Sequence, residues 1–304
     1  MEVTRRRLLQ LLLAAGALPA LGSVTAAPAP LLTRPIPSTG ERLPVIGMGS
    51  YITFDVGTDD DLLAQRTAVL RAFFDAGGKL IDSSPMYDTS EAAIGECLAR
   101  LEHPGALFSA TKVWHWLTGP GDRQMQRSRE LWRVPRFDLM QVHNLVNWPD
   151  HLRTMQRDRE AGLVRYIGIT TSHGRRHDEL ADILRTEKID FVQLTYNIRD
   201  REVEERLLPL AADHGIAVIV NRPFRRGGLI DRYAGKPLPD WAADIDCDSW
   251  PQFLLKFIVS HPAVTCAIPA TSRVDHMQEN MAALRGPLPD AAMRREMIAY
   301  VDTL

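Results

Sequence analysis

Short apolar runs alternate with longer amphipathic segments along the chain from residue 43 onward. The short runs are rich in β-branched residues and no hairpin turn joins neighbouring runs, which predicts parallel strands connected by helices. The expected strands lie at 43–50, 79–83, 107–113, 137–143, 164–171, 190–197, 217–223 and 265–270. The expected helices lie at 61–77, 90–101, 123–133, 151–162, 177–188, 202–215, 250–260 and 274–284, with a kink at Pro209.

Eight strand–helix units in roughly 250 residues indicate a closed (β/α)8 TIM barrel of the α/β class. An open, doubly wound sheet is the alternative, and the absence of a Gly-x-Gly-x-x-Gly turn after the first strand argues against it. Residues 36–43 predict a short N-terminal β-hairpin at the base of the barrel, and 289–304 predict an extra C-terminal helix. We expect one barrel domain over 36–304, preceded by a linker at 27–35.

The N-terminal residues differ in kind from the rest of the chain. A basic cluster at 5–7 precedes an apolar run at 8–21, and small residues follow at 24–26. This order is typical of a secretory signal peptide, here 1–26, and the paired arginines resemble the twin-arginine type. The run is shorter than the roughly 20 residues that span a membrane. We expect export to a bacterial periplasm without stable membrane association after cleavage; an uncleaved N-terminal anchor is the alternative.

Composition excludes several classes of function. Lys and Arg number 36 against 38 Asp and Glu, so the net charge of -2 gives no electrostatic case for a nucleic-acid partner. Three cysteines, Cys97, Cys247 and Cys266, are too few and too widely spaced for a disulfide framework or a zinc cluster. His173 and His177 have a helical metal-binding spacing but no third ligand, and we interpret them as surface residues. We expect no metal and, by default, a monomer.

Ionisable residues end three consecutive predicted strands. Asp82 ends the second strand, Lys112 the third and His143 the fourth, while Tyr87 lies in the loop after the second. The active site of a parallel barrel forms at the carboxyl ends of its strands, and neighbouring strands lie about 4.8 Å apart. Each residue alone has an ordinary structural explanation. Together they indicate one site.

The chemistry of these four side chains is coherent. A phenol has a pKa near 10, a nearby ammonium lowers that pKa, and a carboxylate beside the lysine keeps the ammonium charged. A neutral histidine donates a hydrogen bond to a carbonyl oxygen. The set therefore fits protonation of an oxygen while a hydride reaches the attached carbon.

These segments resemble the aldo-keto reductase family over roughly residues 36–300. The likeness rests on 81–95, 111–113 and 141–143, and continues at 162–169, 192–197 and 268–280. It implies reduction of aldehydes or ketones to alcohols, or the reverse reaction. It also implies Tyr87 as general acid, Lys112 and Asp82 as the pair that tunes it, and His143 as the residue that orients the carbonyl.

The resemblance also implies an NADP(H)-type cofactor extended across the barrel mouth. Arginines beside glycines after the seventh strand, where barrels often bind phosphate, are suited to the pyrophosphate. The candidate cofactor-binding residues are Gly49, Ser50, Thr170, Thr171, Gln193, Asn221, Arg222, Arg225, Thr271, Arg273, His276, Glu279 and Asn280.

Five positions depart from the family pattern. Thr170-Thr171 replaces the usual Ser-Asn, and Asn221 replaces the aromatic residue that commonly stacks on the nicotinamide. Ala270 replaces a lysine and His276 an arginine, so permanent positive charge is missing where the 2′-phosphate is read. NADP(H) is the expected cofactor, and NAD(H) is the open alternative.

Substrate walls are predicted least well, because they come from loops. Trp114 and Trp148 follow the third and fourth strands and are candidates for an aromatic substrate pocket, with rim packing as the alternative. The expected partner is a small carbonyl or alcohol. An exported cofactor-binding regulatory barrel with little turnover is the second hypothesis. A metal-dependent hydrolase is disfavoured, because Lys112 lies between the two available ligands, Asp82 and His143.

Overall fold

The computed structural model describes residues 30–101 and 106–304. The predicted signal peptide and the start of the predicted linker lie outside the described residues, so export stays a prediction. Leu31–Leu304 form one compact unit. Thr33–Pro35, assigned to the linker from sequence, instead form the first strand, β1.

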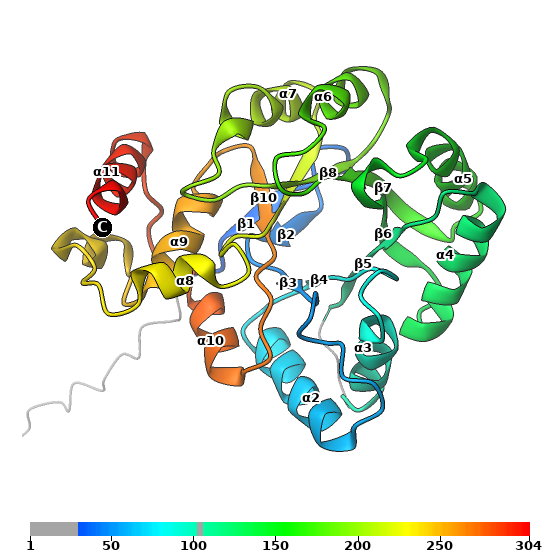
Figure 1. Ribbon diagram of the computed structural model, residues 1–304, viewed down its shortest axis with the longest axis horizontal. Helices are drawn as coiled ribbons and strands as arrows, with labels where there is room; N and C mark the ends of the chain where they lie inside the picture. Colours follow the sequence, from blue (N-terminus) through cyan, green and yellow to red (C-terminus); the bar gives the residue numbers. More distant parts are fainter. Residues whose placement is uncertain (1–29, 102–105) are drawn as a thin grey trace, which may run out of the picture. The chain divides into compact units, whose positions relative to one another are not determined.

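Eight parallel strands form the centre of this unit and follow one another in chain order around the sheet (Figure 1). Bridges from Ile46 to Ala267 and from Gly49 to Ala270 join the first of these strands to the last. The predicted TIM barrel is therefore confirmed. The strands are β3 Met48–Gly49, β4 Leu80–Asp82, β5 Phe108–Val113, β6 Phe137–Val142, β7 Val164–Thr170, β8 Phe191–Thr195, β9 Ala217–Asn221 and β10 Val264–Ala267.

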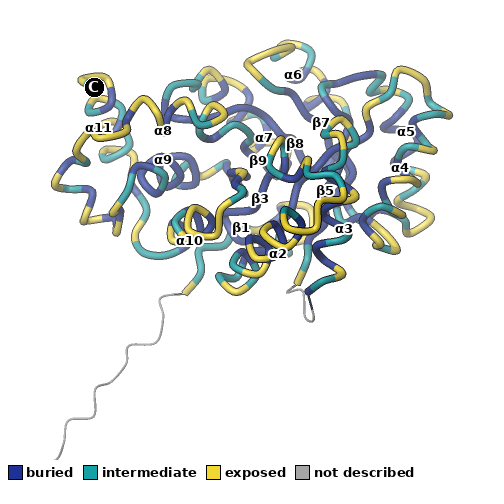
Figure 2. The backbone as a smooth tube through the Cα atoms, turned by 60° about the horizontal axis from the view of Figure 1, so that its bottom comes forward, coloured by how far each residue is buried: buried dark blue, intermediate teal, exposed yellow. Residues whose placement is uncertain are grey.

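Helices follow every strand and pack around the sheet, so the strands are buried and the outer helix faces are exposed (Figure 2). The α-helices are α2 Asp60–Asp75, α3 Ser90–Ala99, α4 Thr118–Trp132, α5 Trp148–Glu160, α6 His177–Thr186, α7 Leu207–Asp213, α8 Gly228–Tyr233, α9 Trp250–Val259, α10 Val274–Ala282 and α11 Ala291–Asp302. Three 3-10 turns, η1 His143–Leu145, η2 Glu202–Glu204 and η3 Asp240–Ile245, complete the described elements. The last helix, α11, is the predicted extra C-terminal helix.

Side chains from β4 to β10 fill one end of the barrel interior. Phe108, Tyr166 and Phe191 pack with ring centroids 5.6–6.1 Å apart. The antiparallel hairpin of β1 and β2 (Arg42–Pro44) adds Ile36 and Leu43 to the same buried cluster, as the sequence predicted for its turn region. Apolar side chains fill this end of the barrel. The open cavity therefore lies at the opposite end, at the carboxyl ends of the strands.

Two elements differ from the sequence prediction. The expected helix at 202–215 is divided into η2 and α7, and Pro209 lies in the first turn of α7. A proline costs no intrahelical hydrogen bond in a first turn, so the break falls before Leu207 instead of at Pro209. Between β9 and α9, α8 and η3 occupy a stretch for which no element was predicted.

Three further findings concern the remaining sequence predictions. The three cysteines are free and buried. Among residues 30–101 and 106–304, no helix has the length and apolarity needed to cross a membrane. The same residues contain no group of three or more His, Cys, Asp or Glu side chains placed to hold a metal ion.

Candidate active site

A cavity of about 500 Å³ opens at the carboxyl ends of the strands. Its walls come from the loops after β3, β4, β6, β7, β9 and β10, together with the end of β8. Ten of the predicted catalytic and cofactor-binding residues line it: Gly49, Ser50, Asp82, Tyr87, His143, Thr170, Thr171, Gln193, Asn221 and Arg222.

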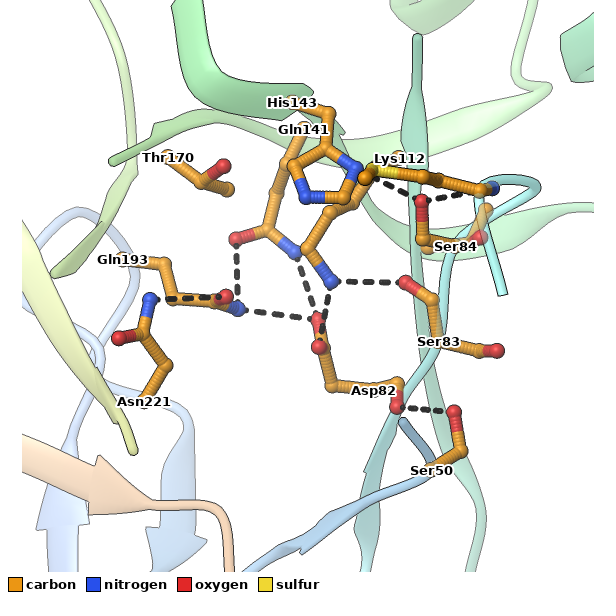
Figure 3. Close-up of polar contacts among 12 residues, drawn as sticks. Ser50, Asp82, Ser83, Ser84, Lys112, Gln141, His143, Thr170, Gln193 and Asn221 are labelled. Atoms are coloured by element: carbon orange, nitrogen blue, oxygen red, sulfur yellow. Dashed lines mark hydrogen bonds and ion pairs between the residues drawn. The ribbon is translucent and has the colours of Figure 1, made fainter. Parts of the chain in front are cut away.

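A buried ion pair, Lys112 with Asp82, includes a residue of the cavity lining, Asp82, and Figure 3 shows its polar contacts. Lys112 Nζ lies 2.5 Å from Asp82 Oδ2 and also donates to the Ser83 carbonyl at 2.7 Å. The second carboxylate oxygen of Asp82 accepts from Gln141 at 2.9 Å and from Gln193 at 3.0 Å. The carboxylate therefore has polar partners on both oxygens, as a buried charge requires.

Strand register brings these groups together. Lys112 on β5 pairs directly with Gln141 on β6, and Asp82 at the end of β4 pairs with Ala110 on β5. Side chains from successive strand ends thus enter the same layer of the barrel. The Ser50 hydroxyl, beyond β3, donates to the Asp82 carbonyl at 3.0 Å and ties the first strand to the same layer.

Tyr87 and His143 lie above the ion pair. Their rings meet edge to face with centroids 5.8 Å apart, and Lys112 Nζ is 5.4 Å from the centroid of the Tyr87 ring. Ser84 Oγ contacts His143 Nδ1 at 2.8 Å and accepts from the Met86 amide at 3.2 Å. The Ser84 hydroxyl hydrogen is then available to Nδ1, which favours the tautomer with a hydrogen on Nε2.

The pKa of Tyr87 differs from the sequence expectation. Burial raises this pKa above its ordinary value, and the nearby Lys112 ammonium lowers it only in part. The lysine therefore acts in the expected direction, but the net shift is upward because desolvation opposes the phenolate. For Lys112 itself, burial lowers the pKa, whereas Asp82 and Tyr87 raise it, with a net upward direction. The free site holds a neutral phenol beside a charged ammonium.

His143 is neutral in this site. Burial, and the positive charge of Lys112, lower its pKa to about 3. A neutral imidazole with its hydrogen on Nε2 is a donor to an oxygen in the cavity without adding a second positive charge beside Lys112.

Amide and hydroxyl groups from β7, β8 and β9 also line the cavity. Asn221 Nδ2 donates to the Thr171 carbonyl at 2.9 Å, and its oxygen accepts from Thr195 at 2.7 Å. Gln193 and Thr170 line the same wall. Asn221 is therefore fixed by polar partners at the position where the sequence comparison expected an aromatic ring.

The arginines after β9 divide into two groups. Arg222 and Arg226 line the cavity, whereas the Arg225 guanidinium is held by Asp200, with Nε 2.8 Å from Oδ2. Arg226 stacks on the Tyr51 ring at 4.8 Å and donates to its hydroxyl at 3.0 Å. The sequence named Arg222 and Arg225; Arg226 and Tyr51 were missed, although Arg226 belongs to the same Arg-Arg-Gly-Gly stretch.

The other predicted cofactor-binding residues do not line the cavity. Arg273 is paired with Asp275 through contacts of 3.0 and 2.5 Å, and the His276 backbone amide contacts the same carboxylate at 3.0 Å. Besides Arg225, the five predicted residues outside the lining come from the segment after β10 and from α10: Thr271, Arg273, His276, Glu279 and Asn280.

The two predicted substrate-pocket tryptophans do not line the cavity. Trp148 Nε1 donates to Glu179 at 3.0 Å, and Trp114 is partly exposed beyond β5. Tyr51, Met86 and Phe224 supply the apolar lining instead. His173 is exposed, as predicted from the sequence, and it also lies at the cavity wall.

Several known proteins are similar to this chain in sequence or in fold. The methylglyoxal reductase YeaE of Escherichia coli is 26% identical over 267 residues, covering 85% of this chain and 91% of that protein. The holo structure of aldo-keto reductase AKR11C1 from Bacillus halodurans superimposes with a TM-score of 0.73 at 20% identity, covering 90% and 96% of the two chains. A Klebsiella pneumoniae aldo-keto reductase in complex with NADPH gives 0.71 at 21% identity, covering 86% and 92%.

A TIM barrel with ionisable side chains around its cavity, together with the similarity to known reductases, identifies the protein as a TIM-barrel oxidoreductase. The sequence model described as the Aldo/keto reductase family matches residues 45–297. The chain belongs to this family.

Proposed function

We propose that this protein reduces small aldehydes or ketones to alcohols with NADP(H), with Tyr87 as general acid. The observation that carries the proposal is the cluster of Tyr87 and His143 directly above the buried Lys112–Asp82 pair, on the wall of one open cavity. The reductase names of the relatives and the NADPH bound in a structural neighbour support the same chemistry.

The cavity residues fit a nicotinamide dinucleotide. A Cβ at Gly49 would lie 2.9 Å from the Ile268 carbonyl, so glycine allows β3 to approach the backbone of the segment after β10 at the rim of the cavity. Gln193 and Asn221 present side-chain amides that match a carboxamide. Arg222 and Arg226 supply positive charge for a pyrophosphate. When bound, the cofactor supplies a hydride to the carbonyl carbon.

The protein's own residues complete the reaction. The carbonyl oxygen accepts a hydrogen bond from His143 Nε2 and from the Tyr87 hydroxyl. As the carbon gains the hydride and the C=O π bond breaks, the Tyr87 proton moves to that oxygen, and the product is an alcohol. The phenolate formed is stabilised by Lys112, which Asp82 holds in place. Solvent returns the proton to Tyr87.

The direct test is consumption of NADPH or NADH by the purified full chain with methylglyoxal and a panel of simple aldehydes. We expect turnover with NADPH, and the ratio of kcat/KM for the two nucleotides measures the consequence of Ala270 and His276. Tight nucleotide binding without turnover of any carbonyl would contradict the proposal and favour a cofactor-binding regulatory protein.

The two arginine groups predict different effects on cofactor binding. Arg226→Gln removes a cation from the cavity, and we expect the nucleotide KM to rise about tenfold, the size of one charge-assisted hydrogen bond. Arg225→Gln removes a guanidinium held by Asp200, and we expect less than about a threefold change. Initial rates at varied nucleotide concentration give both values. Equal effects would show that Arg225 leaves Asp200 to bind the cofactor.

A further inference from the structure

The loop between β7 and α6 adds a third arginine to the cavity lining, beside Arg222 and Arg226. His173 and Arg175 line the same cavity as Tyr87 and His143. Within the described part of the chain, Arg175 has no hydrogen bond or ion pair to another residue. A guanidinium at a cavity wall without a protein acceptor is available to an anionic ligand.

This loop is fixed to the turn that carries His143. The Asn144 amide donates to Thr170 Oγ1 at 3.0 Å, and the Ser172 hydroxyl lies 3.3 Å from Asn144 Oδ1. Arg176 Nη1 donates to the Asn144 carbonyl at 2.9 Å. These three contacts hold the loop, and therefore Arg175, on the side of the cavity where His143 orients the carbonyl.

His173 lies among the cations from both loops. Its pKa is lowered by burial and by Arg222, Arg175 and Arg226, so the imidazole is neutral at neutral pH. The positive charge on the cavity lining therefore comes from three guanidinium groups. The carboxylate on the lining, Asp82, is already paired with Lys112.

Charge balance then separates two anion subsites. A pyrophosphate bridge carries one negative charge on each phosphate, which matches Arg222 and Arg226 on the β9–α8 loop. Arg175 on the β7–α6 loop then has no phosphate of the pyrophosphate to balance its charge. A single guanidinium is suited to one carboxylate, which it binds through two parallel hydrogen bonds.

We propose that Arg175 binds a carboxylate carried by the carbonyl substrate, so that the preferred substrates are aldehyde or keto acids. This inference rests on the proposed function. Met86 and Tyr51 give the cavity an apolar wall against which the carbon chain between the carbonyl and the carboxylate packs.

The test compares acids with their neutral methyl esters. Glyoxylate, succinate semialdehyde and adipate semialdehyde are each compared with their methyl esters, with NADPH as the cofactor. The three acids differ in the number of carbons between the carbonyl and the carboxylate, so the series identifies the length that places the carboxylate at Arg175. We expect kcat/KM to favour the acid by at least about tenfold for one length. Arg175→Gln brings this ratio close to one. Arg71→Gln, an exposed arginine on α2, is the matched control and leaves the ratio unchanged.

Two results would overturn the inference: no preference of the wild type for any acid, or an unchanged ratio in Arg175→Gln with a raised nucleotide KM. The second result would assign Arg175 to the cofactor phosphates. If no aldehyde is turned over, the proposed function fails, and calorimetric titration of acid and ester still decides the inference. Selective binding of the acid that Arg175→Gln abolishes supports the carboxylate subsite, whereas equal binding overturns it.

Discussion

Replacing Tyr87 by phenylalanine is expected to lower kcat for carbonyl reduction by about 10²–10⁴-fold, the usual contribution of a positioned general acid. The substitution removes only the hydroxyl. The ring contacts with Tyr51, at 4.9 Å between centroids, and with His143 remain available. Nucleotide affinity and thermal stability are therefore expected to stay close to those of the wild type. Steady-state rates, a fluorescence titration with NADPH and a melting curve measure the three quantities.

The pH dependence of the rate tests the assignment of Tyr87 as general acid and of His143 as a neutral hydrogen-bond donor. Burial raises the pKa of Tyr87 above 10, and the pKa of His143 is lowered to about 3, so neither group changes protonation between about pH 5 and 9. The wild-type rate of the chemical step is expected to be independent of pH over this range.

The control for Tyr87→Phe is Tyr300→Phe, which removes a hydroxyl on α11 that donates to the Pro237 carbonyl. A Tyr87→Phe enzyme with the rate of Tyr300→Phe would show that another group supplies the proton.

The barrel was predictable because its pattern is regular. Eight apolar runs separated by amphipathic segments admit few arrangements, and parallel order follows from the helical connections. The catalytic cluster was predictable for a related reason. Asp82 and Lys112 lie on strands, and His143 directly follows one, so strand order alone brings them to one rim.

Loop residues could not be placed in the same way. Arg222, Arg225 and Arg226 all have positive φ values, of 53°, 50° and 59°, so the backbone turns sharply between neighbouring side chains. Which arginine faces the cavity depends on that turn and on the acceptor Asp200, which lies 25 positions before Arg225 in the chain. The sequence shows the basic composition of the loop but not the direction of each guanidinium.

The burial of Tyr87, and its effect on the pKa of the phenol, also could not be predicted from the sequence. The expectation of a lowered phenol pKa considered the charge of Lys112 but not the loss of water around the ring. Both effects are present, and the desolvation is larger. The distinction matters for function, because a proton donor must be protonated before the reaction begins. The upward shift keeps Tyr87 in its acid form.

Replacing Lys112 by methionine is expected to destabilise the fold by about 3–5 kcal/mol, because it leaves the Asp82 carboxylate buried without its counter-ion. Lys112 is fully buried, and methionine fills a similar volume. The hydrogen bonds from Gln141 and Gln193 to Asp82 remain but do not neutralise its charge. Chemical denaturation at neutral pH measures the free energy of unfolding.

The double variant Asp82→Asn/Lys112→Met separates stability from catalysis. Removing both charges abolishes the cost of an unpaired carboxylate, so most of the lost stability is expected to return, short of about 1 kcal/mol for the hydrogen bond from Lys112 to the Ser83 carbonyl. Activity is expected to stay low, because no ammonium stabilises the Tyr87 phenolate. A double-mutant cycle gives the coupling energy of the pair. Full recovery of both stability and kcat would mean that the pair serves the fold alone, and that the phenolate draws its stabilisation from His143 or the cofactor.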